Sequence, residues 1–147
     1  MLIRYAEYAE LPLVLDMYMA ALDEIKEVIL SPDLLSCARV VLRSWHTAPC
    51  IIAEKDGEII GFAGLKKTVA PYTTQAQISD YCIYVKPEHR GVKVIKLLSD
   101  ACKDVSEKLG LPLFLTHIFA LGKTQGSAFL DRWGYTPIAT SFSYRGR

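Results

Sequence analysis

The stretch that decides the fold is Tyr84-Val85-Lys86-Pro87-Glu88-His89-Arg90-Gly91-Val92-Lys93-Val94-Ile95. An apolar strand pattern ends at a proline, a short turn carries an arginine and a glycine, and a helical pattern starts at once. The first N–H groups of a helix have no partner inside it, and the helix dipole makes that end mildly positive. Such a turn can bind a phosphate or pyrophosphate, although an ordinary strand-to-helix turn with solvated basic residues has the same sequence.

The patterns on either side of this stretch predict alternating blocks of strands and helices. Asp56-Gly57 between two apolar runs is a strong hairpin signal, and Gly110 is a typical helix end. The order β-α-α-β-β-β-α-β-α-β-β predicts an α/β domain, close to the α+β class, with helices on both faces of a mixed sheet. We expect strands at 2–5, 50–54, 59–65, 75–85, 111–117, 135–138 and 140–144, and helices at 11–25, 32–45, 92–109 and 127–133.

Composition excludes several other classes of protein. The 147 residues, of which 51% are hydrophobic, form one domain, 1–147, with a substantial core. A net charge of +1 with scattered basic residues argues against a nucleic-acid partner. Four well-separated cysteines without a CxxC pair argue against a metal site and indicate buried free thiols. No apolar run approaches the ~18 residues of a membrane span and no signal peptide is visible, so we expect no membrane partner and a cytoplasmic location.

The chain resembles the GNAT superfamily of N-acetyltransferases. Residues 85–91, Val-Lys-Pro-Glu-His-Arg-Gly, are similar to the V-x-P-E-x-R-G sequence that precedes the family's acetyl-CoA loop. The opening strand at 3–4, the hairpin at 54–61 and the ending at 129–135 are also similar to the family. The resemblance implies a mixed sheet of six or seven strands with about four helices. It also implies that acetyl-CoA donates an acetyl group to a primary amine, which attacks directly in a ternary complex.

The resemblance also assigns a donor site. Two positions depart from the family loop, because Lys93 and Ile95 stand where it has small residues. Any residue except proline still supplies the backbone N–H that binds phosphate. Val85 is expected to polarise the thioester carbonyl, with Ile83 and Tyr84 as its neighbours. The pyrophosphate is expected at Arg90, Gly91, Val92, Lys93, Val94 and Ile95.

Two residues are candidate bases for the acceptor amine. Strand alternation predicts that Asp80, Cys82 and Tyr84 share one face, and Asp80 is the ionised member. Asp80 is therefore a candidate base acting through water, and a solvated strand-end aspartate is the alternative. His117 ends the next strand, which by resemblance diverges to admit the pantetheine arm. It is either a second candidate base or a polar residue that ends the strand.

The remaining expectations concern the leaving group and the acceptor. Leu130 stands where many family members have a tyrosine that protonates the CoA thiolate, so water, Ser127, Tyr135 or Tyr144 would take that role. By resemblance, Tyr18, Trp45 and Tyr72 line the acceptor side, although packing explains each one as well. The acceptor is a small-molecule or protein amine, and a homodimer is possible. The rival interpretation is a degenerate GNAT-shaped module that binds CoA or a protein partner without catalysis.

Overall fold

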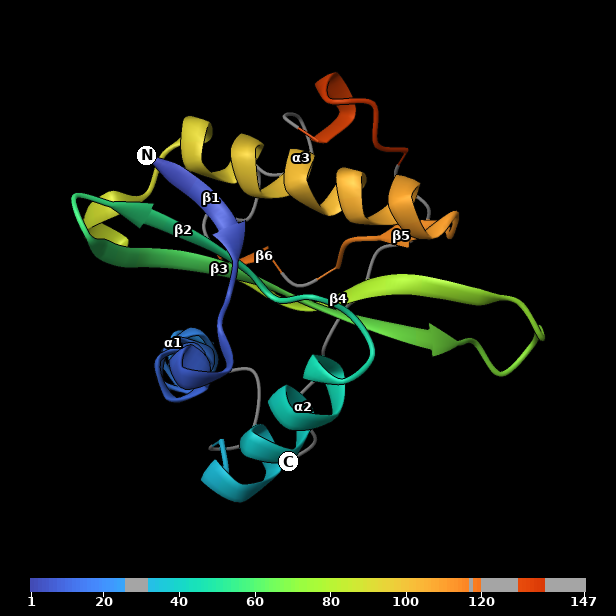
Figure 1. Cartoon of the computed structure of the whole chain (residues 1–147), viewed down its shortest axis with the longest axis horizontal. Helices are drawn as coiled ribbons and strands as arrows, with labels where there is room; N and C mark the ends of the chain where they lie inside the picture. Colours follow the sequence, from blue (N-terminus) through green and yellow to red (C-terminus); the bar gives the residue numbers. More distant parts are fainter. Residues whose placement is uncertain (26–31, 117, 120–129, 137–147) are drawn as a thin grey trace, which may run out of the picture.

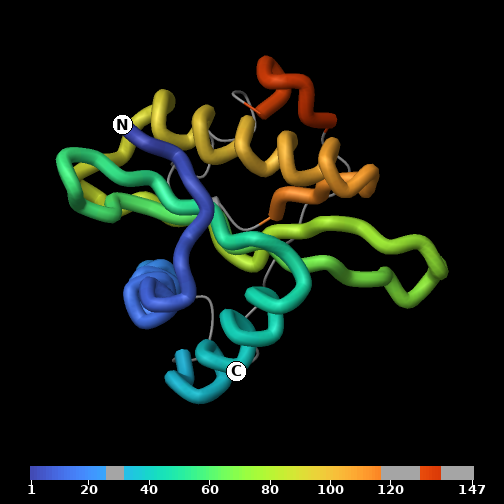
Figure 2. The backbone as a smooth tube through the Cα atoms, viewed as in Figure 1, coloured from blue at the N-terminus to red at the C-terminus, as the bar shows by residue number. Residues whose placement is uncertain are grey.

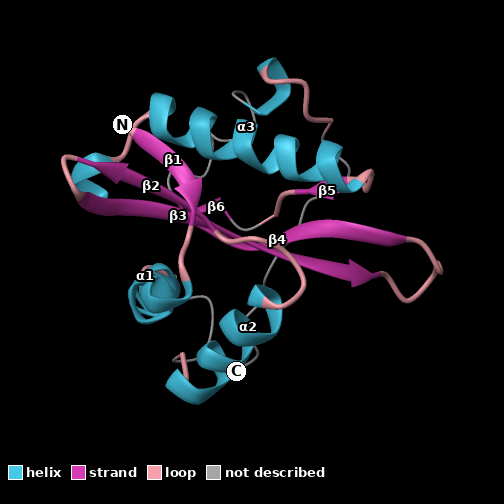
Figure 3. Cartoon of the chain, in the orientation of Figure 1, coloured by secondary structure: helices cyan, strands magenta, loops and turns pink. Residues whose placement is uncertain are grey.

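A computed structural model describes residues 1–25, 32–116, 118–119 and 130–136, in which one mixed sheet lies between two helical layers (Figures 1 and 3). The strands are β1 (Leu2–Tyr5), β2 (Ile51–Lys55), β3 (Glu58–Val69), β4 (Ala76–Val85), β5 (Leu113–Phe114) and β6 (Ile118–Phe119). The α-helices are α1 (Leu11–Asp23), α2 (Leu34–Trp45) and α3 (Val92–Leu109), and the 3₁₀ helices are η1 (Tyr8–Glu10) and η2 (Pro87–His89).

The sheet combines an antiparallel meander with a parallel edge. Strands β1 to β4 are neighbours in order and all antiparallel, whereas β5 and β6 both pair parallel with β4. The six described strands therefore fill five positions across the sheet. This confirms the predicted mixed sheet at the low end of the expected strand number. Residues 130–132 are helical, Trp133 lies in a turn, and residues 135–136 are not in a strand, so the predicted strand at 135–138 is wrong at its start. Residues 127–129, 137–138 and 140–144 lie outside the described residues.

Three segments of the chain meet at one end of the sheet. The β2–β3 turn, the end of β4 and the start of α3 lie together, and the β3–β4 turn projects from the opposite end (Figures 1 and 2). Asp56 and Gly57 have φ values of 52° and 78°, which is the geometry of a two-residue hairpin turn. The hairpin prediction is confirmed, and it places Glu58 beside the loop that leads into α3.

Two helix ends show how well local signals set boundaries. Helix α3 has the predicted bounds, and Gly110 ends it with φ 64°. Helix α2 begins later than predicted, because Asp33 is the N-cap and its carboxylate accepts a 2.8 Å hydrogen bond from the Ser36 N–H. Pro32 consequently precedes the helix instead of lying in its first turn.

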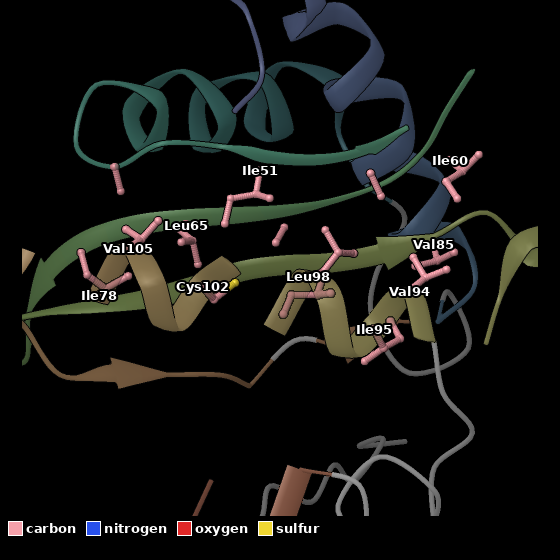
Figure 4. Close-up of a cluster of buried hydrophobic side chains, with 14 residues drawn as sticks. Ile51, Ile60, Leu65, Ile78, Val85, Val94, Ile95, Leu98, Cys102 and Val105 are labelled. Carbon is pink, nitrogen blue, oxygen red and sulfur yellow. The ribbon is translucent and has the colours of Figure 1, made fainter. Parts of the chain in front are cut away.

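Buried side chains form a core on each face of the sheet. The core beneath α3 joins that helix to the sheet through aliphatic residues, as Figure 4 shows. The opposite core joins α1 and α2 to the sheet and is richer in aromatic and sulfur-containing side chains. Residues of the first core include Ile51, Leu65, Ile78, Ile83, Val85, Ile95 and Leu98, and residues of the second include Val14, Tyr18, Val41, Phe62, Tyr81, Cys82 and Tyr84.

Candidate active site

The turn from β4 to α3 presents a row of backbone N–H groups that have no partner in the described part of the chain. Gly91 is the N-cap, and a Cβ added there would meet nothing within 4 Å. Among the described residues, the N–H groups of 91–94 find no hydrogen-bond acceptor. Two predicted donors are already used, because the Arg90 and Ile95 N–H groups donate to Pro87 and Gly91 carbonyls, both at 3.4 Å. The candidate anion cradle is therefore formed by four N–H groups.

The two departures from the family loop leave this cradle open. Ile95 is fully buried and packs, with Val94, between α3 and the sheet (Figure 4). Lys93 is exposed and forms no ion pair with any residue whose position the structure gives. Neither side chain fills the space in front of the N–H groups, and the lysine adds a positive charge beside it.

Most of the positive charge near the cradle is internally neutralised. Lys93 is the exception among the four Lys and Arg residues of 86–96. The other three each contact a carboxylate: Lys86 with Glu58 at 2.8 Å, Arg90 with Glu24 at 2.5 Å, and Lys96 with Asp100 at 2.5 Å.

Arg90 is held by three separate contacts. Its Nε donates to the Val85 carbonyl at 2.9 Å, one Nη2 hydrogen points to Glu24, and its guanidinium lies 5.5 Å from the centre of the Tyr84 ring. Tyr84 belongs to the core beneath α1 and α2. The guanidinium consequently lies on the face of the sheet opposite α3. In this structure the Arg90 side chain therefore does not point into the cradle, although its backbone immediately precedes it.

The expected opening beside Val85 is closed. Lys86 N–H donates to the Ile60 carbonyl on β3 at 2.8 Å, so the N–H of Val85 faces the outer edge of β4, because backbone groups alternate along a strand. Strand β6 lies along that edge, where Ile83 pairs with Ile118 and Tyr84 with Phe119. The predicted divergence of the next strand is therefore wrong at these positions.

Asp80 lies between the two short strands, β5 and β6, that pair with the outer edge of β4. β5 pairs with residues 78–79 of β4, and β6 pairs with 83–84 in the same register. Between them the Asp80 carboxylate accepts from the Thr116 N–H at 2.7 Å and from its hydroxyl at 3.2 Å, and only 1% of Asp80 is exposed. This geometry supports a structural contact, and the role of Asp80 as a base stays a prediction.

A β-bulge corrects the predicted face of Asp80. Gly64 pairs with Cys82 and Leu65 with Asp80, so Tyr81 is an extra residue and the alternation slips at that point. Tyr81, Cys82 and Tyr84 all belong to the core beneath α1 and α2. Asp80 therefore lies on the opposite face from Cys82 and Tyr84. Sequence alternation alone gave no sign of the extra residue.

Tyr135 is the one predicted proton donor that lies among the described residues. Tyr135 donates its hydroxyl to the Ser99 carbonyl at 2.9 Å, and burial raises the pKa of that hydroxyl. It is therefore engaged beside the middle of α3. The other predicted proton donors, Ser127 and Tyr144, lie outside the described residues, as does the candidate base His117.

Of the three aromatic residues predicted for the acceptor side, Tyr18 and Trp45 pack in the core beneath α1 and α2, and Tyr72 lies away from them. Tyr18 is buried and packs edge-on against Tyr81, and burial raises its pKa to about 12. Trp45 packs against Tyr8. Tyr72 is 86% exposed in the β3–β4 turn, and the ten-residue β4 carries the chain about 30 Å from there to Val85. Tyr72 is therefore not part of a site at the end of β4.

A groove lies near the end of β4. The sequence did not predict it, because its lining residues come from four separate segments. It has a volume of about 630 Å³ and is lined by apolar and charged side chains, and Lys86 links it to the end of β4. Its lining residues are Arg4, Glu10, Leu13, Asp16, Met17, Glu54, Gly57, Glu58, Ile59 and Lys86.

Two other groups of polar residues have simpler explanations. All four cysteines are free and buried, as predicted, and burial raises the pKa of Cys50 to about 12. Ligand atoms of Glu58, Glu88 and His89 lie within 4.8 Å of one another. Glu58, however, already contacts the Lys86 ammonium, which a metal ion would have to displace.

Comparison with known proteins identifies the family. The profile of the acetyltransferase (GNAT) family matches residues 16–135, most of the chain. The chain belongs to the GNAT family. The GNAT match runs from the middle of α1 through α2, β2 to β4 and α3, so it includes the candidate cradle. No curated protein sequence matches at a significant level. Among the described helices, none has the length and apolar character that a bilayer crossing requires.

Solved structures share the GNAT fold at low sequence identity. A ribosomal-protein-alanine N-acetyltransferase from Brucella melitensis is 19% identical with a TM-score of 0.66, over 99% of this chain and 100% of its own. An aminoglycoside 6'-N-acetyltransferase from Acinetobacter haemolyticus is 17% identical with a TM-score of 0.69, over 100% and 99%. A predicted acetyltransferase from Clostridium acetobutylicum, solved with acetyl-CoA, is 14% identical with a TM-score of 0.74, over 98% and 95%.

Proposed function

We propose that this GNAT protein transfers an acetyl group from acetyl-CoA to a primary amine by direct attack in a ternary complex. The observation that carries the proposal is the row of N–H groups at 91–94, which lies at the positive end of α3 and bonds to no residue that the structure describes. A pyrophosphate is the anion that a family acyl donor would bring to this position. Lys93 would add a direct charge contact to the backbone hydrogen bonds.

The thioester is assigned to the outer edge of β4, because the Val85 N–H faces that edge. There it would polarise the carbonyl as negative charge develops on the oxygen. β6 pairs with β4 up to Tyr84. Donor binding at this edge therefore requires the β4–β6 contact to open by about one residue pair.

We propose a cationic amine as the acceptor. The groove between α1 and the β2–β3 turn is lined by four carboxylates and two basic residues, and it reaches the end of β4 at Lys86. Arg4 pairs with Glu10 and Glu54, and Lys86 pairs with Glu58, which leaves an excess of negative charge in the lining. Its apolar lining residues, Leu13, Met17 and Ile59, would contact the carbon skeleton of the amine. One structural neighbour is an acetyltransferase of aminoglycoside antibiotics. Asp80 is retained as a candidate base, and His117 as a second one.

Calorimetric titration with acetyl-CoA tests the donor assignment. Lys93→Glu is expected to weaken binding at least tenfold, because it places a negative charge beside the pyrophosphate. Lys67→Glu is the matched control, because it makes the same charge change on β3 near the opposite end of the sheet. Equal effects of the two variants would contradict the cradle. Turnover is then measured as thiol release with spermidine as the acceptor.

The second candidate function is a binding module that lacks catalysis. The observation in its favour is β6, which covers the β4 edge where the thioester would lie. A wild-type protein that binds no acetyl-CoA at millimolar concentration would support this alternative and would refute the enzyme proposal.

A further inference from the structure

Glu24 contacts the donor loop from a distant part of the chain. It is the C-cap residue of α1, 66 positions before Arg90, and one of its oxygens accepts the Nη2 hydrogen bond. About a third of each side chain is exposed. Its second carboxylate oxygen accepts no hydrogen bond from any residue that the structure describes. Glu24 is therefore a counter-ion supplied to the loop by the α1 side of the sheet.

Arg90 has unused capacity for a second anion. A guanidinium carries five N–H donors, and two are occupied, one by the Val85 carbonyl and one by Glu24. The other three donate to no described residue. The backbone of Arg90 immediately precedes the cradle at 91–94, so its side chain can turn toward a phosphate there when the phosphate replaces its contacts with Glu24, the Val85 carbonyl and the Tyr84 ring.

We propose that Glu24 limits acyl-donor affinity by holding Arg90 on the α1 face of the sheet. This inference rests on the donor proposed above. In the free protein the Arg90 guanidinium is hydrogen-bonded to Glu24, and the phosphates of the donor must compete with Glu24 for it. Because the pair is partly exposed, its strength is modest, and the competition is expected to reduce affinity about two- to fivefold.

Glu24→Gln tests the competition, because glutamine keeps a carbonyl acceptor of similar shape and removes only the charge. Acetyl-CoA is titrated by calorimetry into wild type, Glu24→Gln, Arg90→Gln and the double variant. Glu24→Gln is expected to bind about two- to fivefold more tightly than wild type. The gain is expected to vanish in the Arg90→Gln background and to shrink at high salt. Glu88→Gln is the matched control, because it makes the same charge change in the same turn without a described contact to Arg90.

Each outcome decides the inference. Equal or weaker binding by Glu24→Gln overturns it, as does a gain that persists without Arg90 or that Glu88→Gln reproduces in full. If wild type fails to bind but Glu24→Gln binds, the competition is supported and only the activity proposed for wild type fails. If none of the folded variants binds, both proposals fall. Circular dichroism and thermal melting establish that every variant is folded.

Discussion

Gly64→Ala is expected to destabilise the protein by forcing two buried groups together at the β-bulge. A Cβ added at Gly64 would lie 2.2 Å from Cζ of Tyr81 and 2.5 and 2.6 Å from two other ring carbons. The ring cannot easily move, because it is buried between Tyr18 and Phe62, with ring centres 5.3 and 6.3 Å away. Relief therefore requires displacement of the core beneath α1 and α2 or of β4 itself.

The magnitude follows from the cost of overpacking a rigid core. Such substitutions cost about 1–3 kcal/mol, which outweighs the roughly 0.4–1 kcal/mol that alanine gains over glycine by restricting the unfolded chain. For a chain of this size, a loss of 1–3 kcal/mol lowers the melting temperature by about 2–12 °C. Gly91→Ala is the matched control. Its φ of 177° suits any residue and no atom lies within 4 Å of the new Cβ, so no loss of stability is expected.

Thermal melting and urea unfolding measure the effect, and a double-mutant cycle identifies its cause. In a Tyr81→Leu background the colliding ring is absent, so Gly64→Ala is expected to cost less than about 0.5 kcal/mol. A melting temperature for Gly64→Ala within 1 °C of wild type would refute the collision. The same loss in both backgrounds would refute its assignment to Tyr81.

Three further measurements address the acid–base groups. If the role of Asp80 is structural, through its hydrogen bond with Thr116, Asp80→Asn is expected to lower the melting temperature by a few degrees. If Asp80 is instead the catalytic base, Asp80→Asn should remove the acid limb of the kcat/KM pH profile and leave the stability unchanged. The hydrogen bond from Arg4 holds the pKa of Glu10 below its ordinary value near 4.5, so this pair stabilises the fold above that pH and the stabilisation is lost as the pH falls through the lowered pKa. The difference in melting temperature between wild type and Glu10→Gln should therefore be largest near neutral pH and narrow below about pH 4.5; a constant difference would contradict the linkage. Because burial raises the pKa of Cys50 to about 12, iodoacetamide at pH 8 should leave it unmodified in native protein and modify it in urea, and rapid native labelling detected by mass spectrometry would be incompatible with its burial.

Local signals in the sequence were enough for much of the fold. Asp56-Gly57 set the β2–β3 hairpin through its positive φ values, and the periodicity from Val92 to Leu109 with Gly110 set both ends of α3. The anion cradle was also foreseeable, because a strand that ends at proline and runs into a helix leaves unpaired N–H groups. These features depend on residues within a few positions of one another.

The parts that sequence reasoning missed depend on partners far along the chain. The extra residue at Tyr81 is defined only by its pairing with Gly64 on β3, so strand alternation misplaced Asp80. The Glu24 contact joins two elements 66 residues apart, and no local pattern signals it. Tyr72 was assigned to the acceptor side by resemblance, but the length of the β3–β4 arm carries it to the other end of the sheet.

The position of β4 has a consequence for how the protein assembles. Its inner edge pairs with β3, which a short turn connects to it. Its outer edge pairs with β5 and β6, which follow a crossover through α3 and lie 35 positions further along the chain. Local pairings generally form before distant ones, since closing a long loop costs more entropy. The meander is therefore expected to fold first, and the outer edge to close last and reopen most readily. In native-state hydrogen exchange, amides between β4 and β6 should exchange by local opening, while those between β2 and β3 should require global unfolding. The edge proposed to receive the donor would then be the least protected seam of the sheet.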